Sequence, residues 1–386
     1  GAGADTFVVS AQNVSVGNSI GAKTLKQSLQ TSTNFETASG KRQEVKENNI
    51  EDSYDITYGD SITFFVSKTK IPDQDQTDNS GNEDDQKQDD GQKDSETDVI
   101  PDYEVPDTIN GFSFNKEETD DGYQLTFTAN EAMRSAAIKI KGQNVVLKTK
   151  KRKLTAKASV KNKVYDGTTN AEYESSPSIQ NVLDSDENQF YFRYKNPTFE
   201  KKNVGEQQVS PISINLSSDN YEIDDISGLK ATIEQKEITT STIKIKSKVY
   251  DGTITAEYAN KVTLLGVISG DDVQLNVPTP SYDTKNVGTD KKIVFDGDFS
   301  IEGTDSANYR LKEISEVTGT IEKAKLVYRA KDQTRKYGEA NPKLTYEVKG
   351  FVAGDQQSDF NDRTLTLDVP KVKSLGKHEG VIKISG

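Results

Sequence analysis

The sequence contains no cysteine and no tryptophan, and its single histidine is His378. Without cysteine the chain has no disulfide, no thiolate nucleophile and no cysteine-ligated metal, so its small domains must be held together in some other way. One imidazole, placed beside Lys377 and Glu379, supports neither a histidine metal cluster nor a Ser-His-Asp triad. We therefore interpret His378 as an ordinary surface residue and expect no catalytic, metal-binding or cofactor-binding residues.

Long apolar runs are also missing, and only 32% of the chain is apolar. No run of about 18 apolar residues is present, so we expect no segment of this chain to insert into a membrane. The chain begins Gly1-Ala2-Gly3-Ala4-Asp5, without the charged and apolar regions of a signal peptide. Since globular chains are usually about 45–50% apolar with glycine included, the low apolar content indicates partial disorder or small, thin domains.

Acidic residues are concentrated in residues 73–98. This segment has eleven acidic and two basic residues, a net charge of −9 within a total of −13, and no aliphatic or aromatic side chain. It cannot bury enough apolar surface to offset its ordering entropy, so we expect a disordered linker or a disordered loop inserted in a domain. The rest of the chain is nearly balanced in charge, which gives no case for nucleic-acid binding.

Alternation of apolar and polar residues dominates the rest of the chain. It predicts strands with one buried face at Tyr123–Ala129, Phe190–Tyr194, Ile243–Ile245 and Leu365–Val369, with Gly, Asn, Asp and Pro clusters between the strands. Only Glu131–Ala137 is compatible with a helical turn, and no amphipathic helix of ten residues is found. The pattern predicts an all-β chain.

An internal repeat organises the middle of the chain. Four motifs recur in order: Val-Tyr-Asp-Gly-Thr at 164–168 and 249–253, Lys-Asn-Val-Gly at 202–205 and 285–288, Asn-Tyr at 220–221 and 308–309, and Thr-Ile-Glu at 232–234 and 320–322. The offset varies from 83 to 88 residues, and it changes only between motifs, where loop insertions are expected. A third unit begins with the segment that starts at Lys336. It lacks the Asn-Tyr and Thr-Ile-Glu motifs that close the other two units, so we expect it to be truncated at its C-terminus.

The motif residues have a structural interpretation. In Val-Tyr-Asp-Gly-Thr the Asp-Gly pair predicts a turn in which glycine has a positive φ and aspartate bonds nearby backbone. The tyrosine is expected to pack its ring inward and to leave its hydroxyl in solvent. Lys-Asn-Val-Gly predicts a second turn between strands.

These motifs resemble two known domain families. Residues 154–236 and 237–324 resemble YDG repeat domains. Residues 325–386 resemble an MBG-type repeat through Tyr337-Gly338, Asn341-Pro342, Leu344-Thr-Tyr346, Gly350-Phe351 and Gly354-Asp355. Residues 1–153, which include the acidic segment, resemble a bacterial Ig-like domain more loosely.

The resemblance implies tandem small Ig-like β-sandwich domains in an elongated, monomeric array. It also implies a large adhesin-like protein, secreted to a bacterial cell surface and without catalytic residues. Small sandwich repeats offer no cleft for the paired carboxylates of a glycosidase, so we do not expect an enzyme.

Two functions fit this organisation. In the first, which we favour, the chain is a non-catalytic stalk that projects or spaces a binding region. In the second, one module itself binds a host glycan, a matrix protein or a bacterial wall polymer. The sequence identifies no ligand-binding residues for the second function, because it shows no cluster of exposed aromatic residues that would mark a binding face.

Three further features leave alternatives open. Asp-rich turns at 269–272, at 296–298 and at Asp219 are either solvated turns or calcium sites, although none has EF-hand spacing. A Lys–Asn isopeptide crosslink beside a buried acid would stabilise a cysteine-free stalk, but no spacing singles out a trio. The stretch Lys139–Lys163 has ten Lys and Arg and no acidic residue. It is a solvated junction, a polyanion site or a partner of residues 73–98.

Overall fold

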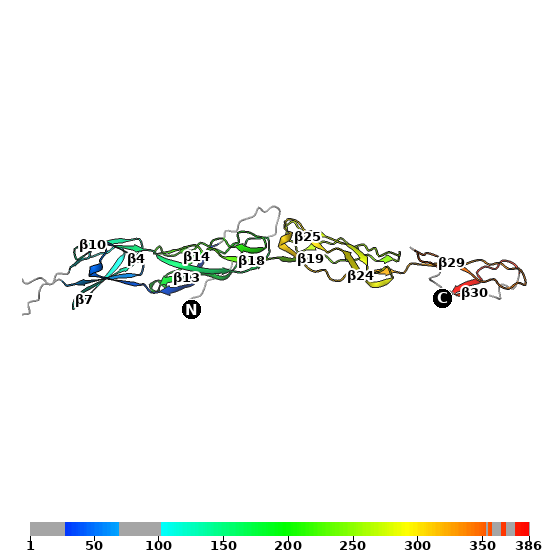
Figure 1. Cartoon of the computed structure of the whole chain (residues 1–386), viewed down its shortest axis with the longest axis horizontal. Coiled ribbons are helices and arrows are strands. Elements are labelled where there is room, and N and C mark those ends of the chain that lie inside the picture. The colour runs from blue at the N-terminus through cyan, green and yellow to red at the C-terminus, as the bar shows by residue number, and fades with distance from the viewer. Residues whose placement is uncertain (1–27, 69–101, 353, 357–363, 368–374, 386) are drawn as a thin grey trace, which may run out of the picture. The chain divides into compact units, whose positions relative to one another are not determined.

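The structure, a computed structural model, describes residues 28–68, 102–352, 354–356, 364–367 and 375–385. These residues form β-strands and three short 3-10 helices, η1 (Glu47–Asn49), η2 (Asp184–Asp186) and η3 (Ser306–Asn308), and include no α-helix (Figure 1). None of their helices has the length and apolar character needed to cross a membrane. The predicted all-β class is therefore confirmed, while the acidic segment 73–98 lies outside the described residues.

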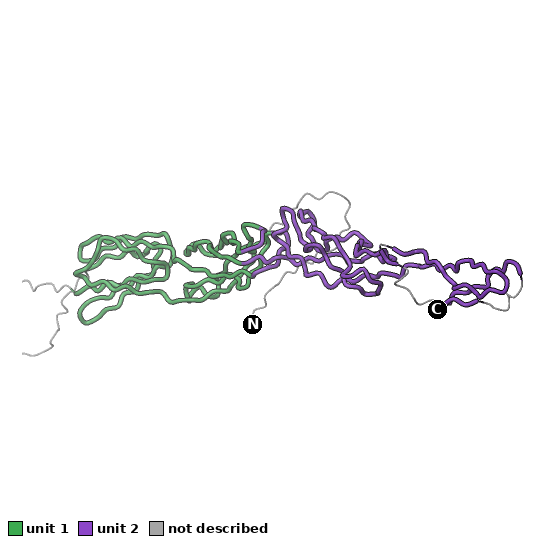
Figure 2. The backbone as a smooth tube through the Cα atoms, turned by 45° about the vertical axis from the view of Figure 1, so that its right-hand side comes forward, with its two compact units in different colours: residues 1–161, 169–201, 206–231 green, residues 162–168, 202–205, 232–386 purple. Residues whose placement is uncertain are grey.

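The chain divides into two compact units (Figure 2). Unit 1 contains the described residues of 1–161, 169–201 and 206–231. Unit 2 contains residues 162–168 and 202–205 together with the described residues of 232–386. The turns of the first repeat that carry Tyr-Asp-Gly and Lys-Asn-Val therefore belong to the same compact unit as the second repeat.

Unit 1 contains an N-terminal sandwich of two four-stranded sheets. One sheet has the order β4 (Ser53–Thr57), β10 (Gln143–Lys150), β9 (Ser135–Ile140) and β6 (Tyr103–Glu104). The other has the order β3 (Arg42–Lys46), β5 (Ser61–Ser67), β8 (Gly122–Ala129) and β7 (Phe112–Thr119). Every second residue of β8 is buried, and the apolar faces of both sheets share one core that includes Phe64, Phe127 and Leu147. Each such side chain stabilises the sandwich by about 1.5–3 kcal/mol relative to an exposed position.

The first repeat supplies the other sheets of unit 1. One has the order β17 (Tyr221–Ile223), β11 (Arg152–Val160), β13 (Tyr173–Leu183) and β2 (Phe35–Ala38). Another has the order β1 (Gln30–Ser32), β14 (Phe192–Tyr194) and β16 (Asn215–Leu216). The remaining strands of this repeat are β12 (Lys163–Val164), β15 (Gly205–Gln208) and β18 (Lys230–Glu234).

Strands β1 and β2 precede the N-terminal sandwich in the sequence but pair with the first repeat. β1 is antiparallel to β14, and β2 is parallel to β13. The ring of Phe35 in β2 meets the ring of Phe190 edge to face, with 5.2 Å between their centroids. An N-terminal segment without any repeat motif thus completes two sheets of the repeat.

The second repeat, in unit 2, reuses the strand pairings of the first. One of its sheets has the order β21 (Leu264–Leu265), β19 (Lys236–Thr240) and β26 (Tyr309–Leu311). A second has the order β20 (Lys248–Val249), β27 (Thr318–Glu322), β24 (Gly288–Asp296) and β23 (Thr279–Tyr282). The third pairs β22 (Gln274–Asn276) with β25 (Ser300–Glu302). The parallel pair β19–β26 corresponds to β11–β17, and β20–β27 corresponds to β12–β18. Tyr282, Ile293 and Ile321 are central to its core.

The last segment of unit 2 contains two antiparallel strand pairs. They are β28 (Val327–Ala330) with β29 (Tyr346–Lys349), and β30 (Thr364–Leu367) with β31 (Ile382–Ser385). The alternation predicted in this region is present, since Leu365 and Leu367 are half-buried and the threonines beside them are exposed.

One local prediction is wrong, and the one segment compatible with a helical turn does not form it. Residues 131–133 form bends and β9 begins at Ser135, so Glu131–Ala137 has no helical turn. Pairing of β9 with β10 overrides the helix propensity of its alanines. Ile243–Ile245 is not a strand, because only Ile245 forms a bridge, to Tyr258, although both isoleucines pack on the core.

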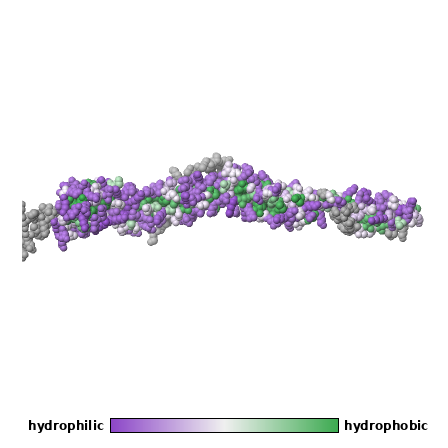
Figure 3. Space-filling model, viewed as in Figure 1, coloured by the Kyte–Doolittle hydropathy of each residue, from purple (hydrophilic) through white to green (hydrophobic). Residues whose placement is uncertain are grey.

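The surface is mostly hydrophilic, as the prediction of small domains with small cores requires. On the face shown in Figure 3, apolar side chains appear as small patches among hydrophilic ones. Exposed apolar residues are nevertheless scattered over the described chain, and Tyr337 is the most exposed of the large ones at 82%. Scattered residues of this kind are normal for protein surfaces and by themselves indicate no binding face.

Candidate functional site

The Tyr-Asp-Gly motif forms the same turn in both repeats. Asp166 Oδ1 accepts hydrogen bonds from the backbone N of Thr168 at 2.8 Å and from Lys163 Nζ at 2.8 Å. In the second repeat, Asp251 Oδ1 accepts the corresponding bonds from Thr253 and Lys248 at 2.9 and 2.8 Å. The glycines that follow, at 167 and 252, both have a φ of 77°. The predicted turn is therefore confirmed, with the lysine as an additional partner.

These hydrogen bonds keep the turn carboxylates charged. The bond from Lys248 is the main cause that lowers the pKa of Asp251 to about 2, and the bonds from Thr253 add to it. At Asp166, burial raises the pKa, but the bonds from Lys163 and Thr168 outweigh burial and hold it below its usual value. Each carboxylate is committed to its own turn, so these motifs act as structural caps.

The tyrosine of the first motif does not behave as predicted. The Tyr165 ring is buried with 1% exposure, as expected, but its hydroxyl is not in solvent. It donates a hydrogen bond to Asp271 Oδ2 at 2.9 Å. The prediction of a solvated hydroxyl is wrong because the second repeat provides a buried acceptor for it.

Asp271 is the centre of a buried cluster. Its side chain is 5% exposed and also accepts a hydrogen bond from the Tyr309 hydroxyl. The rings of Tyr165 and Tyr309 meet edge to face at 5.4 Å, and Lys202 Nζ lies 3.6 Å from Asp271 Oδ1. Beside them Asn308 Oδ1 accepts a bond from the backbone N of Val204 at 3.0 Å. Three repeat motifs thus converge on one carboxylate.

The cluster has a defined protonation state. Burial raises the pKa of Asp271, but the bonds from Tyr309 and Tyr165 and the charge of Lys202 hold that pKa below its usual value. Burial and the bond to Asp271 raise the pKa of Tyr165 to about 12, and the same two causes raise the pKa of Tyr309. At neutral pH the aspartate is an acceptor and both tyrosines are donors. The cluster therefore acts as a charge-assisted clamp and not as an acid–base pair.

Unit 1 contains an equivalent cluster around Asp186. Asp186 Oδ2 accepts hydrogen bonds from the hydroxyls of Tyr221 and Tyr58, the latter at 3.0 Å. The two rings again meet edge to face at 5.4 Å. Asn220 Oδ1 accepts a bond from the backbone N of Ala132 at 2.9 Å. Tyr58 belongs to the N-terminal sandwich. Its hydroxyl therefore donates to an aspartate of the following module, as the Tyr165 hydroxyl does in unit 2.

A tight turn positions Tyr58. Gly59 has a φ of 82°, and a Cβ at this position would lie 2.2 Å from Leu183 Cδ1, so only glycine fits. Next to it Arg152, 4% exposed, binds Asp60 Oδ1 at 3.0 Å. The sequence signal for this cluster is the order Tyr-Gly-Asp at 58–60, a permutation of Tyr-Asp-Gly that lies outside the repeated motifs.

The basic stretch Lys139–Lys163 is largely neutralised. Apart from Arg152, six of its lysines form ion pairs: Lys139 with Glu104, Lys141 with Glu47, Lys150 with Asp55, Lys153 with Asp224, Lys161 with Glu172, and Lys163 with Asp166. A polyanion would have to compete with these carboxylates, and we therefore disfavour a polyanion site there.

The other candidate residues are spread apart. Asp272 accepts hydrogen bonds from Thr304, and Asp296 and Asp298 flank the turn at Gly297. His378 is half-buried in the C-terminal segment. Over the described ranges no group of three or more His, Cys, Asp or Glu side chains is arranged to hold a metal ion.

Comparison with known proteins gives domain matches. A YDG domain matches residues 149–228 and 234–317, and an MBG domain of the YGX type matches residues 326–386. No curated protein matches the chain. Among solved structures, the chain is similar to a crystal structure of the I9–I11 tandem from titin, with 11% identity over 77% of this chain and 100% of that chain. The TM-score of 0.19 is too low for that likeness to support an argument.

Proposed function

Since this chain belongs to the YDG and MBG repeat families, with two YDG domains followed by one MBG domain of the YGX type, we propose that it is a non-catalytic stalk region. The family resemblance predicted from the motifs is confirmed by these matches. The repeat families and the all-β fold favour a non-enzymatic role. We further propose that the parent protein is an adhesin-like protein of a bacterial cell surface, in which this stalk projects or spaces a binding region.

The observation that carries this proposal is the recurrence of the tyrosine–aspartate cluster. A spacer requires that consecutive modules do not pivot freely. Asp271 and Tyr309 belong to the second YDG domain, whereas Tyr165 belongs to the first, so the cluster bonds one domain to the next. Asp186 and Tyr58 repeat the arrangement one module earlier. A hydrogen bond to a charged group contributes about 1.5–3 kcal/mol, enough to favour one orientation of the two modules.

The test is to remove the hydroxyl that joins the domains. We expect Tyr165→Phe and Tyr58→Phe to leave each domain folded but to widen the distribution of distances between modules. Small-angle X-ray scattering of the full chain would show this as a broader distance distribution. Tyr337→Phe is the control, because Tyr337 is exposed.

An unchanged distance distribution in both variants would contradict the proposal. Specific binding of the unmodified chain on glycan or matrix-protein arrays would instead favour the alternative function, in which one module is itself the binding domain.

A further inference from the structure

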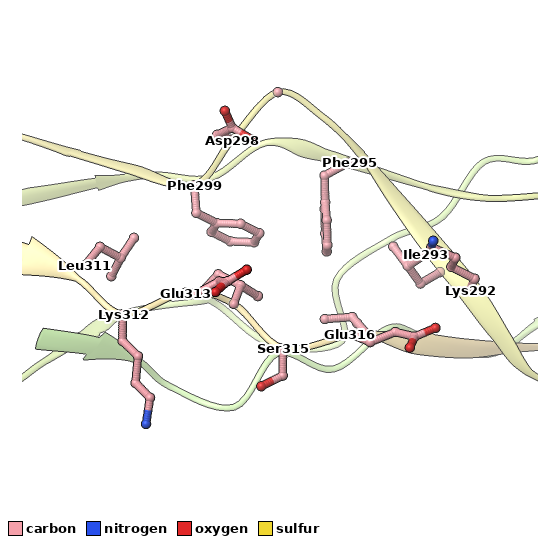
Figure 4. Close-up of a pocket in the computed structure, with 13 residues that line it drawn as sticks. Lys292, Ile293, Phe295, Asp298, Phe299, Leu311, Lys312, Glu313, Ser315 and Glu316 are labelled. Atoms are coloured by element: carbon pink, nitrogen blue, oxygen red, sulfur yellow. The ribbon is translucent and has the colours of Figure 1, made fainter.

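The second YDG domain contains a pocket of about 560 Å³ between residues 295–299 and residues 311–317. Figure 4 shows Phe295 and Phe299 on one side of it, with Glu313 and Ser315 on the opposite segment. The rings of Phe295 and Phe299 meet edge to face at 5.0 Å. Comparison with the first YDG domain explains why a pocket lies here.

Both YDG domains have an equivalent backbone hydrogen bond beside the position of the pocket. In the first domain the backbone N of Val209 donates to the O of Leu229 at 2.9 Å, and in the second Ile293 donates to Val317 at 3.0 Å. The segment containing Leu229 and the segment containing Val317 are aligned with an offset of 88 residues, the same offset that relates Tyr221 to Tyr309. Ile314 of the second domain therefore corresponds to Ile226 of the first.

The first domain fills the adjoining position with its own strand. Ile212 and Ile226 exchange both backbone hydrogen bonds, each at 2.9 Å, and both side chains are buried. This antiparallel bridge continues the pairing that begins at Val209. In the first domain, Ile212 in an extended segment thus pairs with the backbone of Ile226, which is not left as an open strand edge.

The second domain leaves that position open. Its chain passes through Asp296-Gly297-Asp298 instead, and Gly297 has a φ of 97°. Ile314 has no bridge partner, and in the described part of the chain residues 313–316 form no backbone–backbone hydrogen bond. The pocket occupies the place of the missing strand.

The lining of the pocket fits a particular kind of ligand. Ile293 and Val317 are buried at its floor and Ile314 is half-buried, which provides an apolar surface beside the two phenylalanines. Its rim bears three carboxylates and two lysines, none of which forms an ion pair with another described residue: Asp298, Glu313, Glu316, Lys292 and Lys312. Carboxylates therefore outnumber ammonium groups around an apolar floor.

We propose that this pocket binds an extended peptide segment of another protein by β-strand addition. Its backbone would pair with residues 313–315, as Ile212 pairs with Ile226 in the first domain. An aliphatic side chain would occupy the floor beside Phe295 and Phe299, and a neighbouring basic residue would meet the carboxylates of the rim. Unpaired backbone groups favour a peptide because its amides supply both the donors and the acceptors that an open strand edge needs. This inference goes beyond the stalk function and does not rest on it.

The probe is a synthetic peptide, Gln-Val-Ser-Pro-Ile-Lys-Ile, which has the sequence of residues 208–214, the strand that covers Ile226, with lysine in place of Ser213, so that it carries both the aliphatic and the basic side chain of the proposal. The full chain is labelled at the isoleucine δ1 methyl groups for NMR. We expect saturable shifts of the Ile314 and Ile293 methyl resonances at millimolar peptide, with Ile226 unchanged. A peptide N-methylated at its first isoleucine lacks the pairing amide and should bind at least tenfold more weakly.

Two protein variants complete the test. Phe299→Ala should weaken binding at least tenfold, while Tyr337→Phe should not change it. Replacement of residues 295–298 by Pro-Ile-Ser-Ile, the sequence of residues 211–214, should restore the internal strand and abolish binding in a folded domain. This replacement tests the proposal even if Phe299→Ala does not fold.

Several results would overturn the proposal. They are the absence of shifts at millimolar peptide, equal binding of the N-methylated peptide, and undiminished binding to the replacement variant. Stronger shifts of the same resonances with a disaccharide such as cellobiose would identify a sugar site instead. Because no readout involves the distance between modules, these failures are distinguishable from a failure of the stalk proposal.

Discussion

Two aspartates, Asp186 and Asp271, each accept hydrogen bonds from a pair of tyrosines. One tyrosine of each pair belongs to the Asn-Tyr motif of the same domain, and the other comes from the preceding module. A carboxylate buried in this way is stable only while its donors remain, because an unpaired buried charge is costly. The motif tyrosines therefore have a role beyond packing.

Alkaline titration tests the state of Tyr165. Its pKa is raised from 10.0 to about 12, so its contribution to stability is complete below pH 10 and is lost as the pH rises through 12. We expect the absorbance at 295 nm of the native chain to include a tyrosine that ionises near pH 12. Tyr165→Phe should reduce that late component by one tyrosine and leave the rest of it, since Tyr173 also has a pKa raised to about 12. Loss of a component near pH 10 instead would show that the hydroxyl is solvated.

The turn from Lys163 to Thr168 illustrates how one element combines several weak interactions. Asp166 caps the backbone of Thr168, Lys163 binds the carboxylate, and Gly167 adopts a φ that other residues adopt with strain. The turn from Lys248 to Thr253 repeats these contacts. The same six-residue pattern thus gives the same local structure twice.

Removing the turn carboxylate should destabilise the element. We expect Asp166→Ala to cost about 1 kcal/mol of unfolding free energy, by analogy with helix caps, and Asp251→Ala to lower Tm as well. The pKa of Asp251 is lowered from 3.8 to about 2, so its contribution is present above pH 4 and is lost as the pH falls through 2. Thermal melts between pH 2 and 7 would measure both effects.

Asp332→Ala is the control for these melts, since Asp332 is exposed and forms no ion pair with any described residue. Unchanged melting of both turn variants, together with loss of binding to a partner, would contradict the structural role and would indicate a binding role for the motif.

At the scale of the whole molecule, sequence order and module membership differ. The chain contributes β1 and β2 to the first repeat, then forms the N-terminal sandwich, and only then enters the repeat itself. The turns at 162–168 and 202–205 are likewise grouped with the unit of the second repeat. Modules therefore exchange segments with their neighbours in sequence, which couples their stabilities. The domain boundaries at 153, 236 and 324 stay a prediction.

Phe35→Ala tests this coupling. Phe35 is half-buried against Phe190, so we expect a loss of about 2 kcal/mol, below the 3–5 kcal/mol typical of a fully buried phenylalanine. Amide hydrogen exchange should accelerate in β13, which pairs with β2, and remain unchanged in β8 of the N-terminal sandwich. The control is Phe114→Ala, at an exposed position of β7, which should leave the hydrogen-exchange rates of β13 unchanged. Equal protection of β13 in both variants would show that β2 does not stabilise the repeat.

Local patterns in the sequence were sufficient for the all-β class, the two repeats, the Asp-Gly turns and the family resemblance, because each depends on residues close together in the chain. Contacts between distant residues were decided by the tertiary structure. The Tyr165 hydroxyl finds its acceptor 106 residues away at Asp271, and β2 pairs with β13 across more than 130 residues. The pocket at Ile314 depends on the path of Asp296-Gly297-Asp298 relative to a second segment. No periodicity or motif encodes such pairings, since they arise only when separate strands pack together.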